Sequence, residues 1–358
     1  MKKVFIVTPY LSGRGGTETV IQKFFSILGN DSTFKFELFV LGGTDDTSWL
    51  QNVSYNLKKL ILPLALKKFE YIFRLPFWIL SVIRKKPDIV VSTSPIIWTI
   101  FFLFKKITRS KYQVVGWYHF SLSKNPISFF ELKRMDYFWA ISSDIAEEVR
   151  EKGFPSDRIT TVFNPIQVEE NFTMIKQPST KSPFHFVYMG RFDFDGQKNL
   201  SELFRGLSQI NQKFTLDIYG EGADKGKLLQ LAGQLKIDNH TEWKGFRKQV
   251  WREIRNCDAL ILTSKYEGLP MVLIESLAAG LPVISSNCPT GPNDIVQDGK
   301  NGYLYEPGNI EELTTDLTAV RKLEDWNKPQ VLAESVEKFN YLNYKKRILG
   351  ALASISNL

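Results

Sequence analysis

The chain has 358 residues, 43% hydrophobic and 23% charged, values that are ordinary for a globular protein and leave room for two domains. MKK leads straight into strand-like VFIV, so we expect no secretory signal, and two cysteines, Cys257 and Cys288, indicate a reducing compartment without a disulfide framework. The net charge of +8 is uneven, since residues 1–170 hold 23 Lys and Arg against 16 Asp and Glu, whereas residues 171–358 hold 23 against 22. These features predict a cytoplasmic protein.

Short apolar runs alternate with amphipathic segments through the first half of the chain. They read KVFIVTPY, KFELFVL, DIVVST, QVVGWYH, YFWAIS and ITTVF, with a helical pattern at residues 17–28 after the first of them. This alternation is typical of a parallel sheet covered by helices on both faces. It predicts a Rossmann-like first domain.

The first strand ends in LSGRGGTET, a turn in which Gly13, Gly15 and Gly16 precede the predicted helix. Glycines at such a turn let main-chain N–H groups meet an anion or a sugar, although a plain tight turn is an equal alternative. The turn is not G-x-G-x-x-G, because residue 18 is Glu. This argues against an NAD-dependent oxidoreductase.

Residues 55–111 carry 12 basic side chains and two acidic ones, interleaved with aromatic residues. We expect this segment to contact an anionic membrane surface; the alternative is that the aromatic residues are core and the lysines solvated. A spanning helix is disfavoured, because PIIWTIFFLF has only ten residues before Lys105, and YIFRLPFWILSVI contains Arg74 and Pro76. No zinc spacing, helix-turn-helix signal or RNP-like strand accompanies the charge, so we expect no nucleic acid partner.

His119 ends the predicted strand QVVGWYH, at the edge of the sheet where ligands bind. It is a candidate to donate a hydrogen bond to a sugar hydroxyl or to stabilise charge on a leaving group, with a purely structural histidine as the alternative. His185 and His240 are expected to be structural.

The pattern breaks at residues 164–183, which we expect to be a linker, and a second alternation follows: FHFVYMG, FTLDIYG, TEWKGF, DALILT, PVISS and GYLYEP. This predicts an α/β protein of two doubly wound, Rossmann-like domains that face a central cleft. The expected boundaries are residues 1–165 and 166–337, with a C-terminal helix from about residue 338 to 358 crossing back to the first domain.

The strand FHFVYMG is followed by Gly190, Arg191, a flexible loop and then Lys198 at a helix start, so two cations flank a strand end where a diphosphate can lie. Asp193 and Asp195 form a D-x-D pair of the kind that holds a metal in some sugar-nucleotide enzymes. With two cations beside it a metal is redundant, so we expect a solvated loop and no metal site.

The strand DALILT leads into TSKYEGLPMVLIESLAAGLP, where the strand end delivers Glu267 to the crevice and Gly268 lets a ligand approach the backbone. Pro270 suits the first position of the helix that follows. Glu275 lies roughly 7.5 Å further along that helix at about 1.5 Å per residue, which is about the distance from a phosphate to a ribose diol. Gly245 and Phe246, after another strand, are placed to offer backbone and a ring to a base.

Together these motifs resemble the retaining, GT-B-fold glycosyltransferases of family 4, and more narrowly the lipopolysaccharide core 1,6-galactosyltransferases. The resemblance covers essentially the whole chain and rests on GGTET, His119, FNP at 163–165, GRF with Lys198-Asn199, EGLPMVLIE, TGPNDI and GKNGYLY.

The resemblance implies a UDP-sugar donor, with galactose from UDP-galactose as the expected donor sugar, and no cofactor or metal. It implies that Arg191 and Lys198 neutralise the donor diphosphate, that Glu275 holds the ribose, and that Glu267 and His119 act at the sugar. Further donor contacts would come from Gly16, Gly245, Phe246, Gly268 and Leu269, and Gly15 and Gly16 would frame the acceptor side.

Family members diverge in the segment at 55–111, so the acceptor is expected only as a membrane-associated cell-surface glycan or glycolipid precursor. The expected location is the inner face of the plasma membrane, by peripheral association. The alternative is a non-catalytic GT-B-like subunit that binds glycan or protein and assists a true transferase.

Overall fold

A computed structural model describes residues 1–13, 15–167 and 173–356. The contacts divide the chain into two compact units. Unit 1 comprises Met1–Pro165 and Tyr341–Leu358, and unit 2 comprises Ile166–Asn340.

Unit 1 is built on a seven-stranded sheet in which all neighbouring strands are parallel. Its strands lie in the order β3 (Tyr55–Lys59), β2 (Phe34–Gly42), β1 (Lys2–Thr8), β4 (Ile89–Ser92), β5 (Gln113–Tyr118), β6 (Tyr137–Ala140) and β7 (Ile159–Thr161). Its helices are α1 (Gly16–Leu28), α2 (Lys67–Ile83), α3 (Pro95–Thr108), α4 (Phe129–Leu132), α5 (Ser143–Glu151) and α11 (Tyr341–Ser356).

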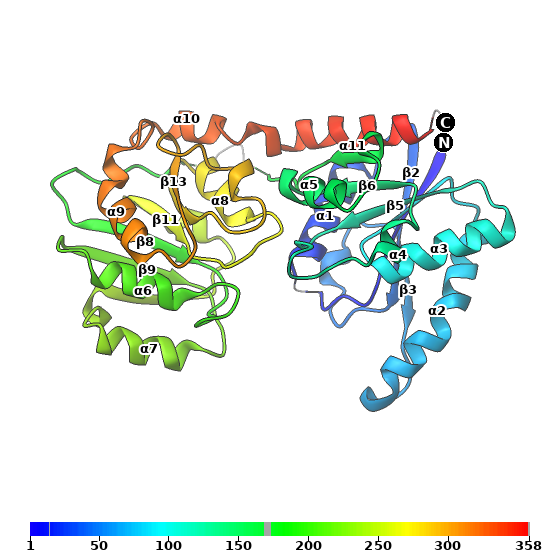
Figure 1. Ribbon diagram of the computed structural model, residues 1–358, viewed down its shortest axis with the longest axis horizontal. Coiled ribbons are helices and arrows are strands. Elements are labelled where there is room, and N and C mark those ends of the chain that lie inside the picture. The colour runs from blue at the N-terminus through cyan, green and yellow to red at the C-terminus, as the bar shows by residue number, and fades with distance from the viewer. Residues whose placement is uncertain (14, 168–172, 357–358) are drawn as a thin grey trace. The chain divides into compact units, whose positions relative to one another are not determined.

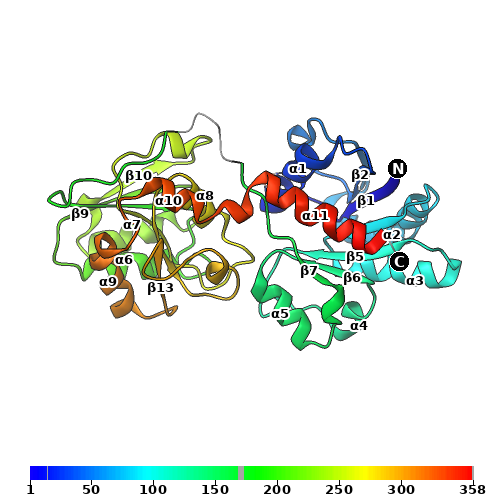
Figure 2. The same cartoon turned by 90° about the horizontal axis from the view of Figure 1, so that it is seen from above.

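Helices α1 and α3 cover opposite faces of this sheet. Trp117 packs against Phe24 of α1, whereas a Cβ on the preceding Gly116 would meet Trp98 of α3, and successive residues of a strand face opposite sides. The returning helix α11 runs across unit 1 towards the chain's start (Figure 2), where Lys2 Nζ donates to the carbonyl of Ser356 at 2.6 Å.

Unit 2 repeats the plan with a six-stranded parallel sheet. The order is β10 (Thr241–Gly245), β9 (Phe214–Tyr219), β8 (Phe184–Met189), β11 (Ala259–Leu262), β12 (Val283–Ser286) and β13 (Gly302–Tyr305) (Figure 1). Its helices are α6 (Leu200–Ser208), α7 (Lys225–Gln234), α8 (Met271–Ala278), α9 (Ile310–Ala319) and α10 (Pro329–Glu334).

Central strands of both sheets are buried on both faces, which explains their unbroken apolar sequences. All four residues of β11 and all four of β4 are buried. The predicted fold class, two Rossmann-like parallel α/β units, is confirmed by the two sheets.

Three details differ from the expectations. Strand β3 was not predicted, because YNLKK is polar and lies at the sheet edge, where it need not be apolar. The predicted C-terminal helix begins at Tyr341 rather than at about residue 338, and it runs as α11 to Ser356.

The expected linker at 164–183 also packs more than its sequence suggests. Ile175 is fully buried and its N–H donates to the carbonyl of Ala279, and the amide of Gln177 donates to the carbonyl of Gly280. Residues 173–183 are therefore part of unit 2. Residues 168–172 lie outside the described residues.

Within the part of the chain that the structure describes, no helix combines the length and the apolar character that crossing a bilayer requires. Cys257 and Cys288 are both buried and free.

Candidate functional site

The strand order of unit 2 reverses between β8 and β11. From β8 the chain moves outward to β9 and β10, and from β11 it moves the other way to β12 and β13. The loops at 190–199 and 263–270 leave the carboxyl ends of these two neighbouring strands. A doubly wound sheet binds its ligands at such a switch point.

An ion pair joins these two loops. Lys198 Nζ lies 2.7 Å from Glu267 Oε1, and Ser264 Oγ donates to the same oxygen at 2.6 Å. The Lys198 side chain is 19% exposed and that of Glu267 9%. The sequence predicted both residues for the site but not their pairing, and it missed Ser264.

A third loop fixes the backbone around Glu267. The N–H of Glu267 donates to the carbonyl of Pro289 at 2.7 Å, and the buried Thr290 hydroxyl donates to the carbonyl of Glu267 at 2.9 Å. A Cβ on Gly291 would lie 2.8 Å from Pro270 Cδ. The TGPNDI turn, which entered the sequence analysis only as a motif of the resemblance, thus supports the Glu267 loop.

Arg191 lies at the carboxyl end of β8 with its guanidinium in solvent. Its side chain is 64% exposed and approaches Asp193 at 3.9 Å and the amide oxygen of Gln197 at 3.4 Å. Its carbonyl accepts from the buried Tyr188 hydroxyl at 3.0 Å, which fixes the backbone. Arg191 is therefore a cation on a fixed backbone, with only long contacts to hold its side chain.

The D-x-D pair serves the loop itself. Asp193 accepts from the N–H of Gly196 at 2.8 Å and of Lys198 at 3.3 Å, and Asp195 accepts from the Ser201 hydroxyl. The expected solvated loop is wrong for Asp193, whose side chain is only 17% exposed because it caps the turn. Among the described residues no three His, Cys, Asp or Glu gather in a way that suits a metal ion.

Helix α8 starts one residue later than expected, with Pro270 as its N-cap and Met271 as its first residue. Leu269 is buried and Gly268 half-buried in the loop before it. Glu275, half-buried on this helix, accepts a long hydrogen bond of 3.4 Å from Trp251 Nε1. Its carboxylate thus lies on the helix that follows Glu267.

Gly245 and Phe246 lie at the same edge of this sheet but further along it. Gly245 N–H and carbonyl groups belong to β10, and its carbonyl accepts from the N–H of Gly220 at 3.0 Å. Phe246 is 62% exposed. The strand β9 separates this corner from β8.

The glycine turn of unit 1 is closed by a buried carboxylate. Glu18 accepts from Ser12 Oγ at 3.1 Å and from the N–H of Gly13 at 2.9 Å. A Cβ on Gly15 would lie 2.6 Å from Glu18 Oε2, whereas a Cβ on Gly16 would meet nothing within 4 Å. A side chain at Gly15 would therefore displace the carboxylate that closes the turn, whereas Gly16 borders open space.

His119 directly follows β5 and packs against Trp117, with ring centroids 4.8 Å apart and the ring planes tilted by 53°. Its Nε2 atom is buried and has no hydrogen-bond partner among the residues described. Burial lowers the pKa of His119 to about 3, so the ring is neutral at physiological pH. It can exchange a hydrogen bond with a ligand, but it brings no positive charge.

The predicted residues thus fall into two groups, one in each unit. Arg191, Lys198, Glu267 and Glu275 lie in unit 2, whereas His119, Gly15 and Gly16 lie in unit 1.

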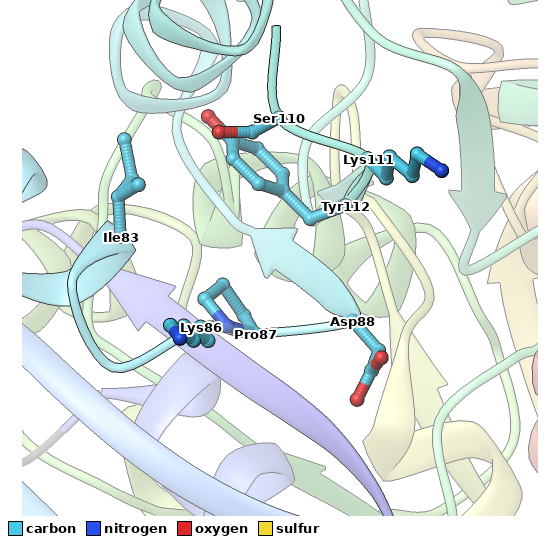
Figure 3. Close-up of a pocket in the computed structure, with 7 residues that line it drawn as sticks. All are labelled: Ile83, Lys86, Pro87, Asp88, Ser110, Lys111 and Tyr112. Carbon is cyan, nitrogen blue, oxygen red and sulfur yellow. The ribbon is translucent and has the colours of Figure 1, made fainter. Parts of the chain in front are cut away.

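A hollow of about 250 Å³ lies in unit 1 at the amino ends of β4 and β5, the opposite end of the sheet from His119. Figure 3 shows Lys86, Asp88 and Lys111 spread around its margin rather than converging on one point. It is therefore not part of either group of site residues.

Comparison with known proteins assigns the class. The family model for glycosyl transferases group 1 matches residues 170–339, and that for glycosyltransferase family 4 matches residues 15–170. The chain therefore belongs to the family 4 glycosyltransferases of the GT-B fold, and it is a hexosyltransferase.

Within this family the chain is similar to two lipopolysaccharide 1,6-galactosyltransferases. The Salmonella typhimurium enzyme is 30% identical, covering 98% of this chain and 99% of the relative, and the Escherichia coli K12 enzyme is 31% identical, covering 97% and 96%. The apo lipopolysaccharide outer core galactosyltransferase WaaB superposes with a TM-score of 0.86 at 30% identity over 98% of this chain and 99% of that one.

More distant solved structures share the fold. Anabaena HepE in complex with UDP matches with a TM-score of 0.78 at 16% identity, covering 99% of this chain and 100% of that one.

The support of the Glu267 loop by Gly291 predicts a specific loss of ligand binding. Gly291 has φ +97°, and an added Cβ would also press on Pro270 and Leu269. Gly291→Ala should lose about 1–2 kcal/mol of stability through its backbone conformation and should also weaken UDP binding by displacing the loop. Calorimetric UDP titration and chemical denaturation measure both effects.

Gly299→Ala is the matched control, because Gly299 has φ +76° and a Cβ there would meet nothing within 4 Å. It should lose similar stability and keep UDP affinity. Equal UDP affinity in the two variants would contradict the role given to the turn.

The neutral state of His119 predicts a pH-dependent stability. The unfolded ring binds a proton near pH 6.5 and the folded ring only near pH 3, so the unfolded state binds more protons between these values. Stability should therefore fall by about 1.4 kcal/mol for each pH unit below about 6.5. Denaturation at pH 7 and pH 5 should show a smaller loss for His119→Gln than for the wild type, and identical losses would contradict the burial of a neutral ring.

Proposed function

We propose that the chain is a retaining, metal-independent glycosyltransferase that moves galactose from UDP-galactose onto a membrane-associated cell-surface glycan or glycolipid precursor, such as a lipopolysaccharide core. The named activity of the two relatives that match nearly the whole chain supports galactose as the sugar and this class of acceptor. The observation that carries the proposal is the placement of Arg191 and Lys198 on the loop after the carboxyl end of β8, beside β11, where the strand order of the sheet reverses.

Lys198 is suited to hold a diphosphate without losing its partner. An ammonium group has three N–H donors and Glu267 takes one of them, which leaves two for phosphate oxygens. Glu267 and Ser264 fix where that ammonium lies before the donor arrives. Arg191, exposed and weakly held, supplies the second cation and can close on the phosphate with a bidentate contact.

The neighbouring residues extend the donor site along the same edge of the sheet. The backbone at Gly268 and Leu269 precedes the N-terminus of α8, where a negative charge is favoured. Glu275 on α8 accepts hydrogen bonds from the ribose diol. Gly245 contacts the base through its backbone and Phe246 through its ring. Glu267 contacts the donor sugar through the part of its carboxylate that does not bind Lys198.

The two cations act mainly when the bond to the sugar breaks, because negative charge then grows on the departing diphosphate. The acceptor hydroxyl attacks on the same face, and the departing phosphate helps accept its proton, so the anomeric configuration is retained. His119, neutral at physiological pH, gives a hydrogen bond to a sugar hydroxyl, and Gly15 and Gly16 frame the acceptor side. Neither step needs a metal ion.

We place the enzyme in the cytoplasm, peripherally bound to the inner face of the plasma membrane, where a lipid-linked acceptor is presented. Its partners are then the UDP-sugar, the glycan acceptor and the anionic membrane surface, without nucleic acid.

The proposal is tested by a panel of nucleotide sugars assayed for hydrolysis and transfer, with and without EDTA. UDP-galactose should be turned over faster than UDP-glucose and UDP-N-acetylglucosamine, and EDTA should leave the rate unchanged. Loss of activity in EDTA would refute metal independence, a different preferred sugar would refute the donor, and failure to bind UDP would indicate a non-catalytic partner subunit.

Substitution of the two cations tests the diphosphate site directly. Arg191→Ala should lower turnover of the donor ten- to hundredfold, since a charged hydrogen bond contributes about 1.5–3 kcal/mol, with little change in stability because the side chain is exposed. Lys198→Ala should lower turnover at least as much and also destabilise the unit by leaving Glu267 unpaired.

Lys213→Ala is the control, because Lys213 is exposed just before β9, at the opposite end of the sheet. Donor use should be unchanged in this variant. Unchanged turnover in Arg191→Ala and Lys198→Ala would rule out the proposed site.

A further inference from the structure

Helix α2 has two apolar faces, of which only one is packed. Leu75, Trp78, Ile79 and Val82 are buried against unit 1. The stripe on the opposite side contains Phe69, Phe73 and Phe77, which are 72%, 73% and 60% exposed. Residues spaced by four lie on one side of a helix, so these three rings form a continuous row. We call this row the phenylalanine stripe.

The stripe is extended by the segment that leads into α2. Ile61 and Leu62 are 74% and 42% exposed, and Ile72, beside the stripe, is 62% exposed. In Figure 1 the N-terminal end of α2 projects from the body of unit 1. Such a concentration of exposed large apolar side chains marks an interaction surface.

The charge around the stripe is almost wholly positive. Lys67 and Lys68 begin α2, and Arg84 and Lys86 follow its end, whereas Lys85 between them pairs with Glu37 at 2.9 Å. The one acidic residue of the helix, Glu70, is buried, accepts from the N–H groups of Ile61 and Leu62, and pairs with Arg74 at 3.0 Å. Its negative charge is thus compensated within the helix and the segment before it.

We propose that the phenylalanine stripe inserts into the interface of an anionic bilayer, with the lysines and arginines at both ends of α2 lying among the lipid headgroups. A bilayer has an apolar layer beneath an anionic one, which matches the apolar rings of the stripe and the basic side chains at its two ends. A second copy of the chain is a poor fit, because two such faces would bring like charges together.

The inference rests on the proposed function for its purpose. An acceptor anchored in lipid is reached only at the bilayer surface, so a helix that inserts there holds unit 1, with the predicted acceptor-side residues Gly15 and Gly16, next to the acceptor. The chemistry of unit 2 does not depend on it, so failure of the stripe to bind vesicles would leave the proposed sugar transfer standing.

Flotation with vesicles tests the stripe. Wild-type protein should float with vesicles containing about 30% phosphatidylglycerol in phosphatidylcholine, bind pure phosphatidylcholine more weakly, and lose binding as salt rises. The triple variant Phe69→Ser, Phe73→Ser, Phe77→Ser should bind the anionic vesicles about a thousandfold more weakly, because each of the three rings removed costs roughly tenfold. Its melting temperature and its hydrolysis of UDP-galactose should be unchanged.

A matched control removes exposed apolar groups elsewhere: Leu229→Ser, Val331→Ser, Leu342→Ser, at positions 47%, 40% and 61% exposed. This variant should float like the wild type. Wild-type flotation by the phenylalanine variant, or absence of wild-type flotation, would overturn the proposal. So would a wild-type dimer that the phenylalanine variant converts to a monomer, because the stripe would then be a self-association surface.

Discussion

The ion pair between Lys198 and Glu267 is the contact on which the donor site depends. Burying two charges is costly unless their geometry is good and further hydrogen bonds satisfy them. Here the pair is 2.7 Å long, Ser264 adds a second donor to the same carboxylate oxygen, and Thr290 and Pro289 hold the backbone of Glu267. These contacts therefore offset the free energy of burying the Lys198 ammonium group at the strand ends before any ligand binds.

This arrangement also separates the tasks of the two cations. The charge of Lys198 is largely compensated by Glu267, so its contribution is a fixed position and two remaining donors. Arg191 keeps most of its exposure and so contributes net attraction for an anion. His119 completes the division, since its burial keeps it uncharged and leaves the positive charge of the predicted site to unit 2.

The sequence predicted the positions of these residues better than their interactions. Glu267, Lys198 and Arg191 follow apolar runs, and strand ends are readable from hydrophobic pattern alone. That Lys198 pairs with Glu267, 69 residues away, depends on the adjacency of β8 and β11, which the chain order does not give. Ser264 was missed because a single hydroxyl residue after a strand carries no motif, and TGPNDI marked Thr290 without its contact to Glu267. Asp193 was misjudged because a capping carboxylate and a solvated one have the same sequence.

Helix α2 is a second case in which the sequence could not show which contacts its residues make. Its aromatic residues at helical spacing left two interpretations open, a packed core or an exposed interaction face. The structure shows both, because Trp78 is buried whereas Phe73 and Phe77 are exposed. A soluble helix that is apolar all round is normally buried all round. One face of α2 stays exposed and has basic residues at both of its ends. Its apolar sequence is therefore explained if that face contacts an apolar partner, which we propose is the bilayer. The peripheral membrane attachment expected from the charge of the sequence is thus assigned, in our proposal, to one face of α2.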